Sequence, residues 1–421
     1  MAHLTGLECT RCGTHYPAGL YFEGCPSCAK DRPANVLPTY DYAAIRKAFS
    51  PDVLPSRETT MWRYREWLPV EDPRHIVTLA EGFTPLVACP RLGERLGLNH
   101  LYVKDESRNP TWSFKDRLSS AAVSKGVEMG AKVITITSSG NGGAAAAAYA
   151  ARAGLDCVVF TTQKFPVTMR TQMQVYGAKV IATPTTQDRW TMVKLCVDKF
   201  GWWPIQNYAE PQVGANPYGV EGFKTMAYEV VEQLGWKAPD WVSVPTAVGD
   251  ALVGMWRGFS EWHDAGWISS RPRMLAAEVF GPLKRAMELD LDHVEPVPTH
   301  PTVAMSAGGQ SSGWQALRAT RDSGGAATDA SEEEILAMQQ ALAATEGIYA
   351  EASSVLSLVG LHKLRVHGQI RENDTVVAVL SATGLKDPDA SQSFLPTIPL
   401  IEPTLKGLEE GLSKAYGFRV P

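Results

Sequence analysis

From about residue 100 onward, hydrophobic and polar residues follow two alternating patterns. Short runs rich in Val, Ile and other β-branched residues predict buried strands. Longer segments between them carry apolar side chains every three or four positions and predict helices. The predicted strands are residues 100–106, 132–140, 156–162, 179–184, 241–246, 273–279 and 375–383. The predicted helices are residues 113–130, 141–154, 167–178, 185–201, 218–235 and 250–266.

This alternation predicts an α/β fold with two doubly wound lobes, because strand–helix repeats bury a mainly parallel sheet between helices. We divide the chain into a four-cysteine, zinc-ribbon-like element (1–40), a large α/β domain (41–100 and 210–421) and a small α/β domain (101–209). The stretch 321–333 is rich in Gly, Ser and Asp, and we expect a loop there.

The charge balance favours a small-molecule partner. Forty basic and 45 acidic residues are interspersed and leave a net charge of -5, which argues against nucleic acid or an anionic membrane surface. The chain shows neither a signal peptide nor a run of the ~20 apolar residues that a membrane span needs. We therefore expect a cytoplasmic protein.

Four of the seven cysteines form two CxxC pairs, Cys9 with Cys12 and Cys25 with Cys28. Two such pairs can complete a tetrahedral Zn–S4 shell, which leaves no open position for water, so the predicted Zn²⁺ site is structural. Two disulfides or a redox-active pair are the alternatives. Disulfides are disfavoured in the cytoplasm, and redox chemistry needs only one pair.

Four stretches lie where a predicted strand meets a helix or turn, which is where open α/β sheets bind ligands. They are "NPTWSFKDR" (109–117), "TSSGNGG" (137–143), "VPTAVGDALVG" (244–254) and "VLSATGLKDP" (379–388). Each alone also fits a solvated lysine, an ordinary turn or small-residue packing. Their occurrence together favours a ligand site.

The order of these stretches resembles the threonine synthase-like branch of pyridoxal phosphate (PLP) enzymes of the tryptophan synthase β fold, or fold type II. Several members also begin with a four-cysteine element. The motifs that carry the resemblance are "EGFTPL" (81–86), "KDESRNPTWSFKDR" (104–117), "SSGNGGAAAAAYAARAG" (138–154), "YGAKVI" (176–181), "NPYGVEGFKTMAYEV" (216–230) and "GLKDP" (384–388).

The resemblance implies PLP as cofactor and assigns roles to residues of this chain. Lys115 would bond covalently to PLP and carry the Cα proton of the substrate, and Phe114 would exclude water. Asn141 would bind the ring hydroxyl, and Ser381 would meet the pyridine nitrogen. The cofactor phosphate would be held by Thr246, Ala247, Val248, Gly249, Asp250 and Ala251.

The resemblance also implies an amino-acid substrate and a homodimer. The substrate carboxylate would be held by Ser138, Ser139, Gly140 and Gly142. Trp112 stands where the family mostly has glycine. It is either a packing residue between the lobes or an aromatic surface offered to the substrate.

Two departures from the threonine synthase pattern affect the expected chemistry. The helix 167–178 lacks the glycine–lysine pairs that the family usually has there. The phosphate loop has one glycine and contains Asp250, either a helix-terminal carboxylate or a charge that loosens PLP. Glu351 is a weaker candidate for the site and fits a helix-terminal carboxylate equally well.

Position 381 carries a serine rather than a carboxylate, and a serine hydroxyl would leave the pyridine nitrogen neutral. A neutral pyridine suits reactions in which the carbanion is consumed at once by loss of a β-substituent. We therefore expect a lyase that converts a β-hydroxy-α-amino acid, such as threonine or a β-aryl serine (phenylserine), to a 2-oxo acid and ammonia. A threonine synthase acting on O-phosphohomoserine and a non-enzymatic member of the fold are the alternatives.

Overall fold

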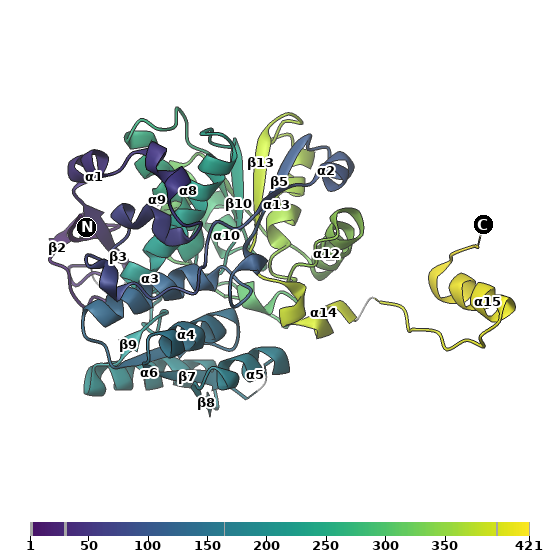
Figure 1. Ribbon diagram of the computed structural model, residues 1–421, viewed down its shortest axis with the longest axis horizontal. Coiled ribbons are helices and arrows are strands. Elements are labelled where there is room, and N and C mark those ends of the chain that lie inside the picture. The colour runs from purple at the N-terminus through teal and green to yellow at the C-terminus, as the bar shows by residue number, and fades with distance from the viewer. Residues whose placement is uncertain (1–2, 29–31, 164, 393–394, 421) are drawn as a thin grey trace.

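The computed structural model describes residues 3–28, 32–163, 165–392 and 395–420. It contains two α/β lobes and a small N-terminal sheet (Figure 1). The sheets have the strand orders β12-β11-β10-β13-β5-β4, β8-β7-β6-β9 and β2-β1-β3. The predicted α/β fold class with two lobes is confirmed.

The six-stranded sheet is parallel except for β4, which runs antiparallel to β5. Its strands are β4 (Leu86–Ala88), β5 (His100–Asp105), β10 (Trp241–Pro245), β11 (Arg273–Ala277), β12 (Ala326–Thr328) and β13 (Thr375–Leu380). In β13, Val377 and Val379 pack into one hydrophobic core and Val376, Ala378 and Leu380 into another. Both faces are thus buried, as in other parallel sheets.

Helices cover both faces of this sheet. Apolar side chains of α9 and α11 belong to one core, and those of α2, α12 and α13 to the other. The helices of this lobe are α1 (Tyr42–Ala48), α2 (Pro90–Leu96), α7 (Pro217–Val220), α8 (Lys224–Gln233), α9 (Asp250–Asp264), α10 (Pro282–Glu288), α11 (Trp314–Asp322), α12 (Glu332–Glu346), α13 (Leu356–Val366) and α14 (Pro388–Gln392). The 3-10 helices are η1 (Pro51–Ser56), η2 (Met61–Trp67), η3 (Pro73–His75), η4 (Glu106–Arg108), η5 (Glu221–Phe223), η6 (Met305–Ala307) and η7 (Gly384–Lys386).

The four-stranded sheet is parallel and forms the smaller lobe. Its strands are β6 (Val133–Thr137), β7 (Asp156–Thr162), β8 (Lys179–Thr183) and β9 (Trp203–Pro204). The helices of this part are α3 (Lys115–Glu128), α4 (Asn141–Arg152), α5 (Val167–Val175) and α6 (Thr186–Phe200). Helix α3 packs against α4 in this lobe and against α7 in the other, so it lies where the two lobes meet.

The structure differs from the sequence-based prediction in three places. Strand β5, which we assigned to the small domain 101–209, pairs with β13 and β4 in the large sheet. Hydrophobic periodicity predicts a strand but not its partner, and the domain limits as such remain a prediction. The expected loop 321–333 contains β12, and the expected helix 218–235 is divided into α7, η5 and α8.

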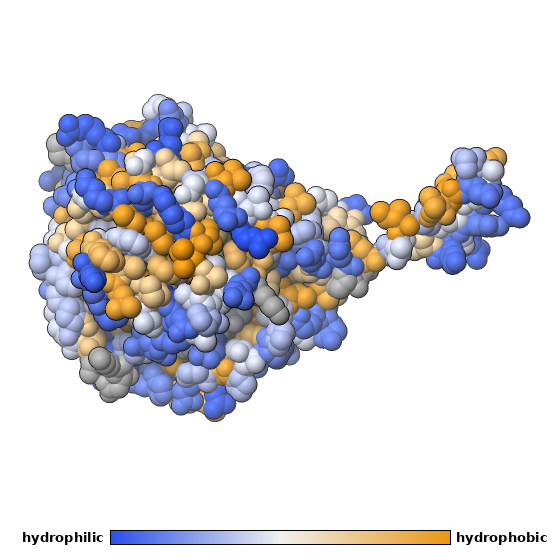
Figure 2. Space-filling model, turned by 90° about the horizontal axis from the view of Figure 1, so that it is seen from below, coloured by the Kyte–Doolittle hydropathy of each residue, from blue (hydrophilic) through white to orange (hydrophobic). Residues whose placement is uncertain are grey.

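The two ends of the chain form separate small elements. The N-terminal sheet consists of β1 (Leu4–Cys9), β2 (His15–Tyr16) and β3 (Val36–Tyr40). At the other end, α15 (Leu405–Tyr416) stands apart from the lobes (Figure 1). Apolar side chains lie along the C-terminal segment that contains α15 (Figure 2), and Leu400 and Leu405 are exposed. Among the described residues, the helices are too short or too polar to span a membrane.

Candidate active site

Lys115 is the first residue of α3, and backbone hydrogen bonds fix this start to the end of β13. The N–H of Phe114 donates to the carbonyl of Ser381 at 2.8 Å. The N–H of Thr383 donates to the carbonyl of Trp112 at 3.3 Å. The predicted PLP lysine and the predicted pyridine partner therefore lie on two joined segments.

The amino group of Lys115 makes no hydrogen bond or ion pair with any residue that the structure describes. Its Nζ lies 4.9 Å from the ring centroid of Phe114 and 5.8 Å from that of Phe223. Burial lowers the pKa of Lys115, and the carboxylates of Asp250 and Glu351 counter part of this effect. A lysine in such surroundings can lose its proton and act as a nucleophile.

Asn141 begins α4 and is oriented by Glu351. Its Nδ2 donates to Glu351 Oε2 at 2.7 Å, while its buried Oδ1 has no partner among the described residues. The hydroxyl of Ser306 donates to the other oxygen of Glu351. Burial raises the pKa of Glu351, and these two hydrogen bonds oppose the shift. Asn141 thus keeps one free polar atom for a ligand.

Ser381 follows β13 and is 4% exposed. Its hydroxyl lies 2.9 Å from that of Ser354, which also accepts from the N–H of Ala382 at 3.0 Å. No carboxylate of the described chain contacts Ser381. The polar group predicted to face the pyridine nitrogen is therefore a neutral hydroxyl pair.

The predicted phosphate loop presents free backbone donors at the N-terminus of α9. The N–H groups of Ala247, Val248 and Gly249 donate to no acceptor in the described part of the chain. Gly249 has φ 101°, and a Cβ there would lie 2.3 Å from the side chain of Ala316. Together with the positive end of the helix dipole, these donors suit a phosphate group.

Asp250 is the first residue of α9 and contacts a neighbouring loop. Its Oδ1 accepts a hydrogen bond from the N–H of Ala215 at 3.0 Å. Burial raises the pKa of Asp250, and the positive charge of Lys115 opposes the shift. Asp250 is thus a first-turn carboxylate within electrostatic reach of Lys115, and its predicted effect on PLP stays a prediction.

The two serines predicted to hold the substrate carboxylate have different partners. The hydroxyl of Ser138 accepts from the N–H groups of Gly140 at 3.2 Å and Gly143 at 2.9 Å, and so caps the start of α4. The hydroxyl of Ser139 accepts instead from side chains of Thr161 and Arg189. Ser138 therefore stabilises the loop, whereas Ser139 belongs to a polar cluster.

The glycines of this loop are closely packed. A Cβ on Gly140 would lie 3.2 Å from the sulfur of Met169, and one on Gly142 would lie 3.0 Å from Nε2 of Gln206. Substitution at either position would displace a neighbouring side chain. Their predicted contact with the substrate carboxylate stays a prediction.

Trp112 has φ 67° and is 54% exposed. A left-handed backbone is unfavourable for a residue with a Cβ, by about 1–2 kcal/mol. An exposed indole recovers little of this energy by burial. The exposure of the indole does not favour Trp112 as a packing residue between the lobes, and both interpretations of Trp112 stay predictions.

The four predicted metal ligands meet at one point. The sulfur atoms of Cys9, Cys12, Cys25 and Cys28 all lie within 4.8 Å of one another, and all four thiols are free. Cys9 and Cys28 are 3.7 Å apart, as are Cys12 and Cys25. Zn–S bonds of about 2.3 Å in a tetrahedron put sulfurs about 3.8 Å apart, whereas a disulfide needs about 2.05 Å. The cluster therefore fits a Zn–S4 site.

Lys386 and Asp116 are two buried ionisable groups that the sequence did not single out. Lys386 is 2% exposed, and its Nζ donates to Gln172 of α5. Burial lowers the pKa of Lys386 to about 8 and raises that of Asp116 to about 7. The only available signal was position, since Lys386 lies in "GLKDP" and Asp116 follows Lys115.

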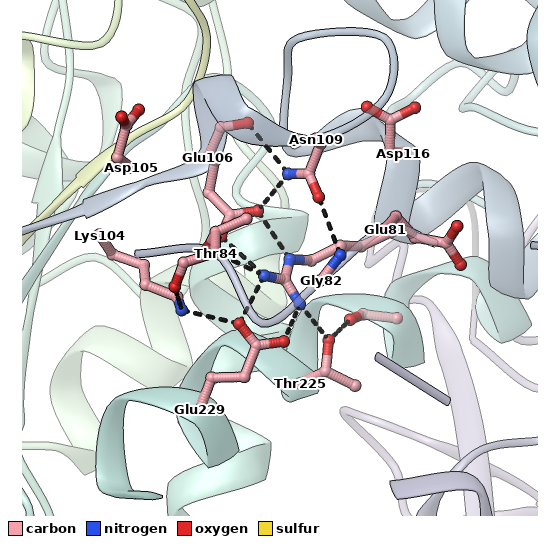
Figure 3. A network of polar contacts seen from close by, with 12 residues as sticks. Glu81, Gly82, Thr84, Lys104, Asp105, Glu106, Asn109, Asp116, Thr225 and Glu229 are labelled. Carbon is pink, nitrogen blue, oxygen red and sulfur yellow. Dashed lines mark hydrogen bonds and ion pairs between the residues drawn. The ribbon is translucent and has the colours of Figure 1, made fainter. Parts of the chain in front are cut away.

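A second group of buried charges includes Lys104, Glu106 and Glu229, which Figure 3 labels, together with Arg117, two residues after Lys115. Arg117 forms ion pairs with Glu106 at 2.6 Å and with Glu229 at 2.5 Å. Glu229 also pairs with Lys104 at 2.7 Å, and Thr84 donates to Glu106 at 2.6 Å. The two basic residues Lys104 and Arg117 thus pair with the two acidic residues Glu106 and Glu229. This network joins η4, α3 and α8.

The family comparison agrees with this site. The model of the family described as pyridoxal-phosphate dependent enzyme matches residues 77–382, so the chain belongs to that family. The free amine of Lys115, the free N–H groups of the phosphate loop and the unpartnered Oδ1 of Asn141 fit this cofactor. PLP would supply an electron sink for the carbanion formed at the substrate Cα.

Threonine synthases are among the relatives. The enzyme of Methanocaldococcus jannaschii is 38% identical over 84% of this chain and 87% of its own length. That of Methanosarcina acetivorans is 33% identical over 96% of this chain and 98% of its own length. The resemblance to threonine synthase-like enzymes is therefore confirmed.

Solved structures share the fold at lower identity. Threonine deaminase isoform 2 of Solanum lycopersicum has a TM-score of 0.64 and 18% identity, covering 82% of this chain and 88% of its own. Maize serine racemase has a TM-score of 0.63 and 19% identity, covering 74% and 91%. These likenesses concern the fold alone.

Proposed function

We propose that this protein is a PLP-dependent lyase that eliminates the β-hydroxyl of a β-hydroxy-α-amino acid and releases a 2-oxo acid and ammonia. The amine of Lys115 would bind the cofactor and move the Cα proton. The rings of Phe114 and Phe223 would limit water near that amine. The neutral hydroxyl of Ser381 supports elimination, because a neutral pyridine stabilises a carbanion less than a protonated one.

Trp112 is the observation that carries the choice of substrate. It lies three residues before Lys115 and has an unfavourable backbone conformation and an exposed ring. A residue that costs stability and packs little is expected where it serves binding. An exposed aromatic side chain three residues before the reactive lysine would favour a β-aryl serine over substrates with small side chains.

The test is a substrate screen of the purified protein with threonine, serine, phenylserine and O-phosphohomoserine, following keto acid, ammonia and phosphate together. We expect keto acid and ammonia in equal amounts, fastest with phenylserine. Trp112→Gly should raise KM for phenylserine more than for threonine. Equal changes for both substrates would contradict the proposed role of the indole.

Threonine synthase activity is the second candidate, and the sequence relatives favour it. Phosphate and threonine released from O-phosphohomoserine, without keto acid, would establish it and refute the lyase. Absence of product from all four compounds would favour the third possibility, a member of the fold without catalytic activity.

We further propose a structural Zn²⁺ in the four-cysteine cluster, a homodimer and a cytoplasmic location. The sulfur separations support zinc. Elemental analysis should find one zinc per chain, and Cys12→Ser should lower that content. Light scattering should give twice the mass of one chain.

A further inference from the structure

Arg189 of α6 is a half-buried cation without an acidic partner among the described residues. Its Nη1 donates to the hydroxyl of Ser139 at 3.0 Å, and its buried Nε donates to no residue that the structure describes. Burial lowers the pKa of Arg189, and no carboxylate opposes the shift. A desolvated charge without a counter-charge is unfavourable, so this arrangement requires an explanation.

The acidic side chains at the start of α6 are engaged elsewhere. Asp188 precedes Arg189 directly, but its Oδ2 accepts from both the N–H and the hydroxyl of Thr185 in a capping box. Glu210 accepts a hydrogen bond from Gln187. The counter-charge for Arg189 is therefore not supplied by these neighbours.

The hydroxyl proton of Ser139, which contacts Arg189, is also available as a hydrogen-bond donor. The hydroxyl of Ser139 accepts a hydrogen bond from Arg189 and another, at 2.9 Å, from the hydroxyl of Thr161. Thr161 lies near the end of β7. With these two bonds the acceptor positions of Ser139 are filled, and its own proton is donated to no atom in the described ranges. Arg189 and Ser139 together thus offer a positive charge and free N–H and O–H donors.

Ser139 lies in the segment between β6 and Asn141, and Thr161 lies near the end of β7, so the cluster is at the carboxyl edge of the small sheet. We propose that Arg189 and Ser139 form an oxyanion site that binds a carboxylate or phosphate group of the substrate. The oxyanion is either the α-carboxylate of every amino acid or a second anionic group on the side chain. The proposal rests on the amino-acid substrate proposed above and adds the residue that supplies the charge.

The test measures equilibrium binding rather than turnover. The holoenzyme, Arg189→Met, Arg189→Lys and the control Arg170→Met are titrated with three probes by calorimetry. Phenylalanine carries a carboxylate but no β-hydroxyl, 2-phenylethylamine lacks the carboxylate, and inorganic phosphate represents a second anion. Arg170 is an exposed arginine on the neighbouring helix α5 and serves as the matched control.

We expect Arg189→Met to weaken the binding of an oxyanion probe by about 10- to 100-fold, because hydrogen bonds to charged groups are strong. Loss with phenylalanine but not with 2-phenylethylamine would assign the site to the α-carboxylate. Loss confined to phosphate would assign it to a second anion. Arg189→Lys should retain part of the affinity, and Arg170→Met should match the wild type.

The thermal midpoint separates this role from a structural one. Removing an unpaired, half-buried charge should leave the midpoint of Arg189→Met unchanged or higher. A clear decrease would overturn the proposal, as would equal weakening of phenylalanine and 2-phenylethylamine. Failure of the wild type to bind both phenylalanine and phosphate would also overturn it. Because none of the probes carries a β-substituent that can be eliminated, these outcomes are independent of the substrate screen.

Discussion

Helix α3 carries two cations only two residues apart, and their surroundings are opposite. Arg117 meets Glu106 and Glu229 within 2.6 Å, and all three side chains are fully buried. Lys115 contacts two aromatic rings and forms no ion pair with the described residues. Arg117 therefore joins elements of the fold, whereas the amine of Lys115 remains available to bind a cofactor.

This difference indicates how the protein separates stability from reactivity. A buried charge that is fully paired keeps its protonation state and holds its partners in place. A buried charge without a partner has a shifted pKa and can exchange a proton or bind a ligand. Lys115 belongs to the second kind. Asp116, Arg189 and Lys386 are intermediate, because they have neutral hydrogen-bond partners but form no ion pair with the described residues.

The largest effect is expected at the unpaired amine. Lys115→Ala should reduce turnover by about 10³-fold or more, because the proposed nucleophile and proton carrier has no substitute. The thermal midpoint of the apoprotein should stay the same or rise. Steady-state rates and calorimetry measure the two quantities, and activity near the wild-type value would refute the role of Lys115.

The paired cation should show the reverse behaviour. Arg117→Met leaves Glu106 and Glu229 buried with too few partners, and we expect the free energy of unfolding to fall by about 3–5 kcal/mol. Urea unfolding measures this loss. The control Arg318→Met breaks an exposed ion pair with Asp322 and should cost no more than about 0.5 kcal/mol. Similar values for both variants would remove the distinction.

Asp116 should produce a pH-dependent effect. Burial raises the pKa of Asp116 to about 7, well above its value in the unfolded chain. The folded state therefore binds the proton more tightly, and this carboxyl lowers stability as pH rises from about 4 to 7. Asp116→Asn should remove that slope and exceed the wild type by up to about 4 kcal/mol at pH 8. Parallel stability curves for the two proteins between pH 4 and 8 would contradict this expectation.

The smallest effect is expected at the phosphate loop. Asp250→Asn removes a carboxylate beside the proposed phosphate site, so PLP should bind about three- to tenfold more tightly. Because burial raises the pKa of Asp250, its charge and the difference should both grow with increasing pH. Equilibrium dialysis with PLP at two pH values measures it. Unchanged affinity would show that the carboxylate does not loosen the cofactor.

The positions of strands and helices could be predicted from the sequence, whereas the pairing of the strands could not. The strand predicted at 156–162 coincides with β7, because its residues are β-branched or apolar on both faces. The three-residue strand β12 lies in a Gly-rich stretch and was missed, since its pairing with β11 comes from the sheet. Strand β5 was found, but its pairing with β13 and β4 was not predicted for the same reason.

In the candidate site, too, the positions of residues along the chain were predicted better than their contacts in space. Strand ends and glycines indicated where Lys115, Asn141 and the phosphate loop lie. The different partners of Ser138 and Ser139 could not be predicted, because adjacent serines look alike in a sequence. Arg189 reaches Ser139 from fifty residues away, and nothing in its own segment indicates this contact.

The hydrogen bonds between the start of α3 and the end of β13 have a mechanical consequence. Lys115 and Ser381, the proposed partners of opposite parts of the cofactor ring, are held on one rigid support by the bond from Phe114 N to Ser381 O. Asn141 and Ser139 are attached to the other sheet. A change in the angle between the lobes would therefore move Asn141 and Ser139 relative to Lys115 and Ser381, and would keep the separation of Lys115 and Ser381 constant.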